Sequence, residues 1–95
     1  MVSALAPSDV TDRLARLEGW SLADDKLYRQ LIFKDFSAAW DFMSAVALLA
    51  EQLDHHPEWS NVYNRVEIAL TTHDAGGISE RDFDLARLIN QHLDQ

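Results

Sequence analysis

The sequence predicts an α+β fold of order α-β-β-α-β-β-α, a four-stranded antiparallel sheet with three helices packed on one face. Three segments have the apolar spacing of helices, and two pairs of short strand-like runs lie between them. A short turn joins the runs of each pair, which is typical of hairpins, and two hairpins separated by a helix favour one sheet. With 95 residues and no visible repeat or linker, the chain is expected to form a single domain over residues 1–95.

The first helix and the first hairpin are expected in the first third of the chain. Ser8 or Asp9 can cap a helix that continues to about Leu17, and Gly19 ends it. An Asp-Asp pair follows and is typical of a turn between strands. The predicted strands of this hairpin span residues 20–22 and 27–33, with Asp24 and Asp25 at the turn.

A long apolar helix is expected next, from about Ser37 to Asp54. Ser37 is a suitable N-cap, and Pro57 disfavours helical geometry at His56, so the helix should stop there. Apart from its main apolar stripe, the helix carries a second apolar face. In a domain with one sheet, that face is expected to contact another subunit. It is formed by Trp40, Ala47 and Leu48.

The second hairpin and the last helix follow. A strand is predicted over residues 59–63, a turn over 64–65 and a strand over 66–73, where apolar residues alternate with others at the period of a half-buried strand. A Gly-Gly pair then ends the strand. Ser79 can cap the third helix, and Asp82, three residues later, completes a capping-box pattern.

The composition excludes several classes of protein. A net charge of −8, from 8 basic and 16 acidic residues, repels phosphate backbones and anionic membranes, so nucleic acid is not expected as a partner. The absence of cysteine excludes disulfides, thiolate metal sites and a cysteine nucleophile. No apolar run of about 18 residues is present to span a membrane. The N-terminal segment has no basic and apolar regions typical of a secretory signal, so a cytoplasmic location is expected.

Three of the four histidines mark the candidate site. His55 and His56 lie at a helix-to-strand junction, and His73 lies at the end of a predicted strand. If that strand returns toward the end of the long helix, the three side chains converge on one cleft. Because imidazole has an ordinary pKa of about 6.5, it can donate or accept a proton at neutral pH. Such a cluster suits an elimination, in which an acid protonates a leaving hydroxyl and a base removes a neighbouring proton.

Other readings of these residues stay open from the sequence alone. A His-His pair at a helix C-terminus can be structural, because the helix dipole favours imidazolium there. Three histidines can also hold zinc with water as a fourth ligand, although no H-E-x-x-H spacing is present. Trp59 can either pack or line the cleft. Polar and acidic neighbours that would share the cleft are Glu51, Asp54, Thr71, Thr72 and Asp74.

Residues 51–64, which contain the His-His-Pro sequence, resemble the signature of the pterin-4a-carbinolamine dehydratases. The similarity continues over residues 66–77, which include His73, and reaches Asp82. Weaker similarity at residues 19–20 and 33–36 extends it over nearly the whole chain. The resemblance implies the fold predicted above and association as a homodimer or homotetramer.

The resemblance also implies an activity: dehydration of 4a-hydroxytetrahydropterin to quinonoid dihydropterin, in recycling the tetrahydropterin cofactor of aromatic amino acid hydroxylases. It implies that His55, His56 and His73 are the catalytic histidines, with His55 and His73 as the acid/base pair and His56 chiefly holding the pterin. It also implies that neither cofactor nor metal is required. A non-catalytic dimerisation or assembly module of the same fold is the alternative. The implied substrate-binding residues are Glu51, Asp54, Pro57, Trp59, Thr72 and Asp74, with Trp59 as an aromatic wall.

Overall fold

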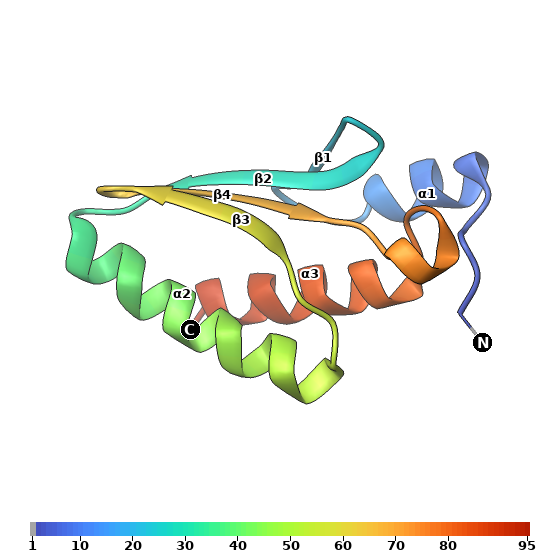
Figure 1. The fold of residues 1–95 in the computed structure, drawn as a ribbon. Helices are drawn as coiled ribbons and strands as arrows, with labels where there is room; N and C mark the ends of the chain where they lie inside the picture. Colours follow the sequence, from blue (N-terminus) through green and yellow to red (C-terminus); the bar gives the residue numbers. More distant parts are fainter. Residues whose placement is uncertain (1) are drawn as a thin grey trace.

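The computed structural model describes residues 2–95 and, within them, shows three α-helices and one four-stranded antiparallel sheet (Figure 1). The element order is the predicted one, and the fold class is confirmed. In the sheet the strands lie in the order β1-β2-β4-β3. The elements are α1 (Pro7–Leu14), β1 (Ser21–Ala23), β2 (Lys26–Ile32), α2 (Phe36–Leu53), β3 (Glu58–Val62), β4 (Arg65–Leu70), the short 3₁₀ helix η1 (His73–Ala75) and α3 (Glu80–Leu93).

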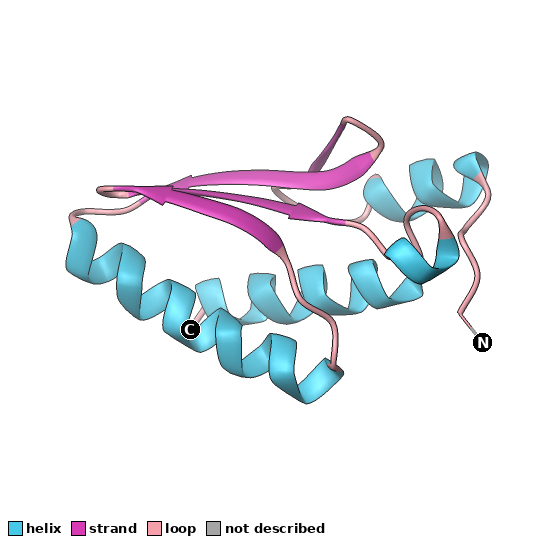
Figure 2. Cartoon of the chain, in the orientation of Figure 1, coloured by secondary structure: helices cyan, strands magenta, loops and turns pink. Residues whose placement is uncertain are grey.

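The apolar core lies between the sheet and the two long helices α2 and α3, which cover the same face of the sheet (Figure 2). Val66, Ile68 and Leu70 alternate along β4 and are buried on that face, because successive residues of a strand point to opposite sides. They form one cluster with Val46 of α2 and Ile89 of α3. The predicted strand period therefore identifies the inner face of β4 correctly.

The first helix, α1, lies beside the start of α3 and adds Val10 to the core. It begins at Pro7, whose ring suits the first helical turn, so neither predicted cap residue is used. It ends at Leu14, and the predicted end near Leu17 is wrong. Beyond Leu14 the chain tightens to bonds between residues three apart, such as Leu17 N–H to Leu14 O at 3.0 Å.

Both hairpins close through two-residue turns. Asp24 and Asp25 form the first, as predicted, with φ values of +53° and +60°. Tyr63 and Asn64 form the second, one residue earlier than predicted, because Arg65 is already paired in β4. The strands of the first hairpin are each displaced by one residue from their predicted bounds.

The central helix α2 begins one residue before the predicted cap, because Asp35 rather than Ser37 caps it. The Asp35 carboxylate accepts the N–H of Ala38 at 2.9 Å. At the other end Asp54 adopts a left-handed conformation, with φ of +50°, which ends the helix and turns the chain toward β3. Within residues 2–95, no helix combines the length and apolar character needed to cross a membrane.

The strand β4 ends at Leu70, so the predicted strand over residues 66–73 is too long. After it, Thr72 forms an isolated bridge with Gly77, with Thr72 N–H bound to Gly77 O at 3.1 Å. The chain between them closes as η1, and Gly76 adopts the left-handed conformation that follows it. His73 therefore lies on a tight turn beyond the sheet, not on a strand.

The second apolar face predicted for α2 is exposed. Trp40 and Leu48 are 56% and 68% accessible, and the Trp40 ring stacks on the exposed Phe36 at a centroid distance of 6.3 Å. Ala47 is exposed beside them. Large apolar side chains grouped on one helix face are typical of a contact surface.

The cap assignment yields a test of α2. We expect Asp35→Ala to lower the free energy of unfolding by about 1 kcal/mol, because the N–H of Ala38 loses its acceptor. Ser37→Ala is the matched control and should change it by less than about 0.5 kcal/mol. Urea unfolding at one protein concentration measures both. A larger loss in the Ser37 variant would contradict the observed cap.

Candidate active site

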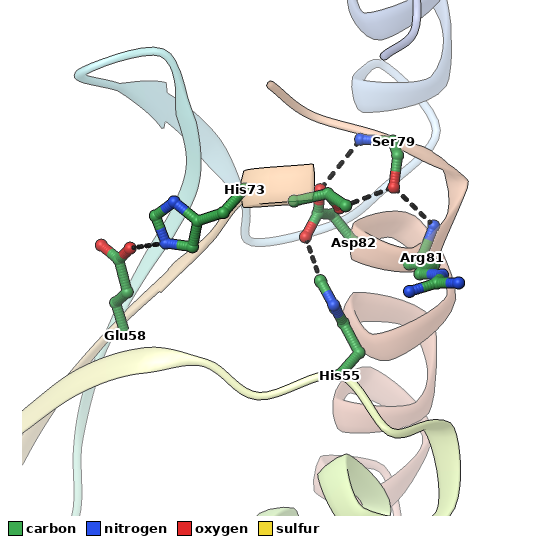
Figure 3. A network of polar contacts seen from close by, with 7 residues as sticks. His55, Glu58, His73, Ser79, Arg81 and Asp82 are labelled. Atoms are coloured by element: carbon green, nitrogen blue, oxygen red, sulfur yellow. Dashed lines mark hydrogen bonds and ion pairs between the residues drawn. The ribbon is translucent and has the colours of Figure 1, made fainter. Parts of the chain in front are cut away.

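His55 is held between the end of α2 and the start of α3. Its backbone N–H donates to Ala50 O at 3.0 Å, immediately after the left-handed residue Asp54. The side chain is nearly buried, and its Nε2 lies 2.5 Å from Oδ1 of Asp82 (Figure 3). The reversal of the chain at Asp54 thus points this imidazole at α3.

Asp82 is a fully buried carboxylate at the start of α3. Its Oδ2 accepts the N–H of Ser79 and the hydroxyl of Thr72, each at 2.9 Å, and the Thr72 hydroxyl lies 2.6 Å from that of Ser79. A buried carboxylate costs several kcal/mol unless it is paired and hydrogen-bonded, and three donors and the helix N-terminus meet that need here. One carboxylate therefore completes the predicted capping box and also fixes His55.

The partner of His55 determines which ring nitrogen is available. A carboxylate only accepts hydrogen bonds, so Nε2 carries the proton that points at Asp82, and Nδ1 is left to exchange protons. Among residues 2–95, no buried side-chain nitrogen or oxygen lacks a hydrogen-bond partner. Since the bond to Asp82 occupies only Nε2, Nδ1 is in contact with solvent.

The three predicted histidines line one pocket of about 240 Å³. It lies where the end of α2 and η1 meet the first turn of α3, so two distant stretches of the chain converge as the sequence suggested. His56 and His73 are exposed, unlike His55. The full lining is Asp54, His55, His56, Thr71, Thr72, His73, Asp74 and Arg81.

The exposed histidines also contact carboxylates through Nε2. In His56 it lies 2.5 Å from Oε2 of Glu51, one turn earlier on α2, and in His73 it lies 2.9 Å from Oε2 of Glu58 on β3. Glu58 in turn accepts a bond from Lys26 Nζ at 2.6 Å. The bond from Lys26 is the main cause that lowers the pKa of Glu58. Partial desolvation opposes it, and the bond from His73 acts in the same direction as Lys26.

Three residues that the resemblance implied for substrate binding are outside the walls of this pocket. Glu51 reaches it only through His56, and Pro57 is not part of the lining. Trp59 pairs with Ile68 in the sheet and packs against the core, and a separate depression lies beside it. The expected aromatic wall is therefore not supplied by Trp59 in this pocket.

The resemblance implied that Thr72 binds substrate, whereas in the structure its side chain contacts Asp82 and Ser79. It is 3% exposed, and its hydroxyl is engaged with Asp82 and Ser79. The side chain therefore supports the carboxylate behind His55 instead of offering a free group to a ligand. Asp54 and Asp74 are exposed on the lining and keep their carboxylates available.

The sequence did not single out two site residues, Glu58 and Arg81. Arg81 brings a guanidinium to the pocket lining, and Glu58 contacts His73. Neither has a local signal, because each is one charged residue in an exposed segment. The capping-box spacing predicted where Asp82 would be, but it did not predict the contact with His55.

The geometry gives no support to the zinc reading. Within the part of the chain that the structure describes, no group of three His, Cys, Asp or Glu side chains is arranged to hold a metal ion. In each of the three imidazoles, Nε2 contacts a separate carboxylate.

This α+β domain thus carries a pocket lined by three imidazoles, each of which contacts a carboxylate. Residues 3–92 match the model of the family described as Pterin 4 alpha carbinolamine dehydratase. The chain therefore belongs to the pterin-4a-carbinolamine dehydratase family, and its enzyme class is that of the hydro-lyases.

The similarity of this chain to its relatives and to a solved structure extends over nearly its whole length. A protein of Rhodopseudomonas palustris (strain BisB18) named for this dehydratase is 53% identical over 92 residues, covering 95% of this chain and 91% of its own. One of Novosphingobium aromaticivorans, similarly named, is 53% identical over 94 residues, covering 97% and 98%. A transcriptional coactivator/pterin dehydratase from Brucella melitensis has a crystal structure with a TM-score of 0.90 and 45% identity, covering 94% of this chain and 97% of its own.

The buried carboxylate provides a second prediction. In Asp82→Asn a neutral amide with one acceptor oxygen replaces a carboxylate that accepts from His55, Ser79 and Thr72, so the network loses its charge-assisted bonds and either a donor loses its acceptor or His55 must change tautomer. We expect the free energy of unfolding to fall by about 2–3 kcal/mol. Asp84→Asn, on the same helix and paired with Arg87 at the surface, is the control and should cost less than about 1 kcal/mol. Equal effects in chemical unfolding would contradict the network.

Proposed function

We propose that this chain dehydrates 4a-hydroxytetrahydropterin to quinonoid dihydropterin and water by histidine general acid/base catalysis. The observation that carries the proposal is the shared pocket of His55 and His73, one imidazole fixed by a buried carboxylate and the other exposed. Family membership supports the reaction type, and the pocket supports the mechanism.

The reaction requires two proton transfers at neighbouring atoms. The C4a–O bond breaks, N5 loses its proton, and a C4a=N5 double bond forms, so no electrons enter or leave. Hydroxide is a poor leaving group and must leave as water, which requires a proton donor beside the hydroxyl. A donor and an acceptor at fixed places each contribute a factor of about 10²–10⁴ to the rate.

The two imidazoles suit these tasks in different ways. His55 presents Nδ1 from a position fixed by Asp82, whereas His73 lies on an exposed turn and contacts the surface carboxylate of Glu58. In this proposal they are the acid/base pair, and His56 chiefly holds the pterin. Asp54 and Asp74 offer oxygen atoms that can accept the amino and ring N–H groups of the heterocycle.

The wider role follows from the product. Quinonoid dihydropterin is the form that a reductase returns to tetrahydropterin, so we propose that this enzyme serves an aromatic amino acid hydroxylase in the cytoplasm. We also propose that residues 1–95 form a single domain of this dehydratase family.

Substitution of the histidines tests the mechanism. We expect His55→Ala and His73→Ala each to lower the rate of carbinolamine dehydration by about 10²-fold, because each removes one proton-transfer group. The rate is followed by the absorbance of 4a-hydroxytetrahydropterin as it disappears. His92→Ala, at the far end of α3, controls for loss of an imidazole outside the pocket. Wild-type rates in both pocket variants would refute the assigned roles.

The exposed face of α2 supports a further part of the proposal, a homodimer or homotetramer. Trp40 and Leu48 present a large apolar surface, whose burial against a second copy would stabilise a domain this small. The alternative function is a non-catalytic assembly module, in which the same face binds another protein. The name of the Brucella melitensis relative, which includes a coactivator role, gives this alternative its support.

A charge placed on α2 tests the assembly. We expect Leu48→Glu to shift the chain to a smaller species in analytical ultracentrifugation, because a carboxylate would have to be buried in the contact. Leu22→Glu, at an exposed leucine of β1, is the matched control and should keep the wild-type mass. An unchanged mass in the Leu48 variant would exclude α2 as the contact. A wild-type chain that assembles but does not dehydrate the substrate would favour the assembly module.

A further inference from the structure

The three carboxylates that contact the histidines are held in place to very different degrees. Asp82 is buried and has three donors. Glu51 is 74% exposed on the surface of α2, and His56 is its only hydrogen-bond partner among residues 2–95. Glu58 is intermediate: it is exposed, yet both of its oxygens are engaged. Glu58 is therefore the one surface carboxylate in this set with a fixed position.

Lys26, Glu58 and His73 form a continuous chain of contacts from three separate segments. Lys26 Nζ lies 2.6 Å from Oε1 of Glu58, and Oε2 of the same carboxylate lies 2.9 Å from Nε2 of His73. Figure 3 shows the His73 ring directed toward Glu58 and away from Asp82. The lowered pKa of Glu58 agrees with this double contact.

The order of the strands makes the contact possible. β2 and β3 lie on either side of β4, so Lys26 and Glu58 approach each other across the outer face of that strand. Ala69 lies directly opposite Glu58 at this point of β4. Ala69 also pairs with Tyr28 of β2, and Lys26 lies two residues before Tyr28 on the same face, so the Lys26 ammonium reaches Glu58 diagonally.

We propose that Glu58 is a positioning residue for His73, and that Lys26 acts on His73 only by fixing the Glu58 carboxylate. This inference rests on the proposed function of His73 in the acid/base pair. The His73 side chain is 80% exposed on the η1 turn, where it has three staggered χ1 rotamers available. The bond to Glu58 selects one of these rotamers. Because Glu58 accepts the Nε2–H of His73, Nδ1 is left for proton exchange.

The exposure of His73 and Glu58 limits how much turnover can fall when Glu58 is changed. Selecting one of three rotamers raises the population of the competent arrangement about threefold. The ion pair adds at most about fivefold, because water and salt screen charges at the surface. We therefore expect a small, specific loss of turnover when Glu58 is changed, well below the loss from removing His73 itself.

The experiment compares Glu58→Gln with wild type. A glutamine has one acceptor oxygen and cannot serve both Lys26 and His73. We expect kcat for carbinolamine dehydration to fall about threefold to fivefold, with KM and the melting temperature unchanged. Three-bond NMR couplings about χ1 of His73 should change from those of one rotamer to an average over several. Glu67→Gln, on the outer face of β4 and paired with Arg65, is the control and should leave kcat and the couplings as in wild type.

Lys26→Met distinguishes a direct effect of Lys26 from one that passes through Glu58. Alone, it should give the same changes as Glu58→Gln to a lesser extent; combined with Glu58→Gln, it should add nothing. A further loss in the double variant would overturn the role of Lys26, and wild-type kcat or unaltered couplings in Glu58→Gln would overturn the role of Glu58. The couplings need no substrate, so failure of this inference can be told from failure of the proposed reaction, which would show as inactivity of the wild type.

Discussion

The buried carboxylate of Asp82 is the constraint on which the site depends. It accepts the Ser79 N–H that starts α3, the Thr72 hydroxyl that follows β4, and the His55 ring beyond α2. Three segments that are distant in the sequence therefore meet at one charge. Because a buried carboxylate is costly without all of its donors, the alternative in which these segments separate is strongly disfavoured. The interactions that close the fold at this end also orient the His55 imidazole.

The three histidines differ in how firmly they are held, because the carboxylates that they contact are buried to different degrees. His55 is nearly buried and its carboxylate partner fully so, whereas His56 and His73 are exposed and contact surface glutamates. The site thus combines one nearly buried imidazole, held by a fully buried carboxylate, with two exposed ones that are held by surface carboxylates. This gradient follows from how far each segment lies from the core.

The sequence predicted the features that rest on local patterns. The order of elements followed from apolar periodicity, and the capping box at Ser79 followed from spacing alone. Asp35 and Ser37 both have N-cap chemistry, so the choice between them depended on the approach of the preceding strand and was predicted wrongly. The sequence left the placement of Trp59 open, because a tryptophan at the start of a strand can either pack against the core or line a cleft.

The contacts that the sequence could not predict depend on the order of the strands. Lys26 and Glu58 are 32 residues apart, and they meet because β2 and β3 are both paired with β4. No local pattern in the sequence indicates that these two strands share the same neighbour.

The acidic character of the chain has a direct relation to the proposed substrate. The net charge of −8 includes the carboxylates of Asp54 and Asp74 on the pocket lining, with Arg81 as the cation among them. Such a pocket repels anions such as phosphates, and its free oxygens accept hydrogen bonds. A pterin carbinolamine is uncharged at neutral pH and presents an edge of amino and ring N–H donors. The net charge that argues against nucleic acid as a partner thus favours a neutral heterocycle rich in N–H donors. Because such a substrate is neutral, it needs no long-range electrostatic attraction to enter the pocket.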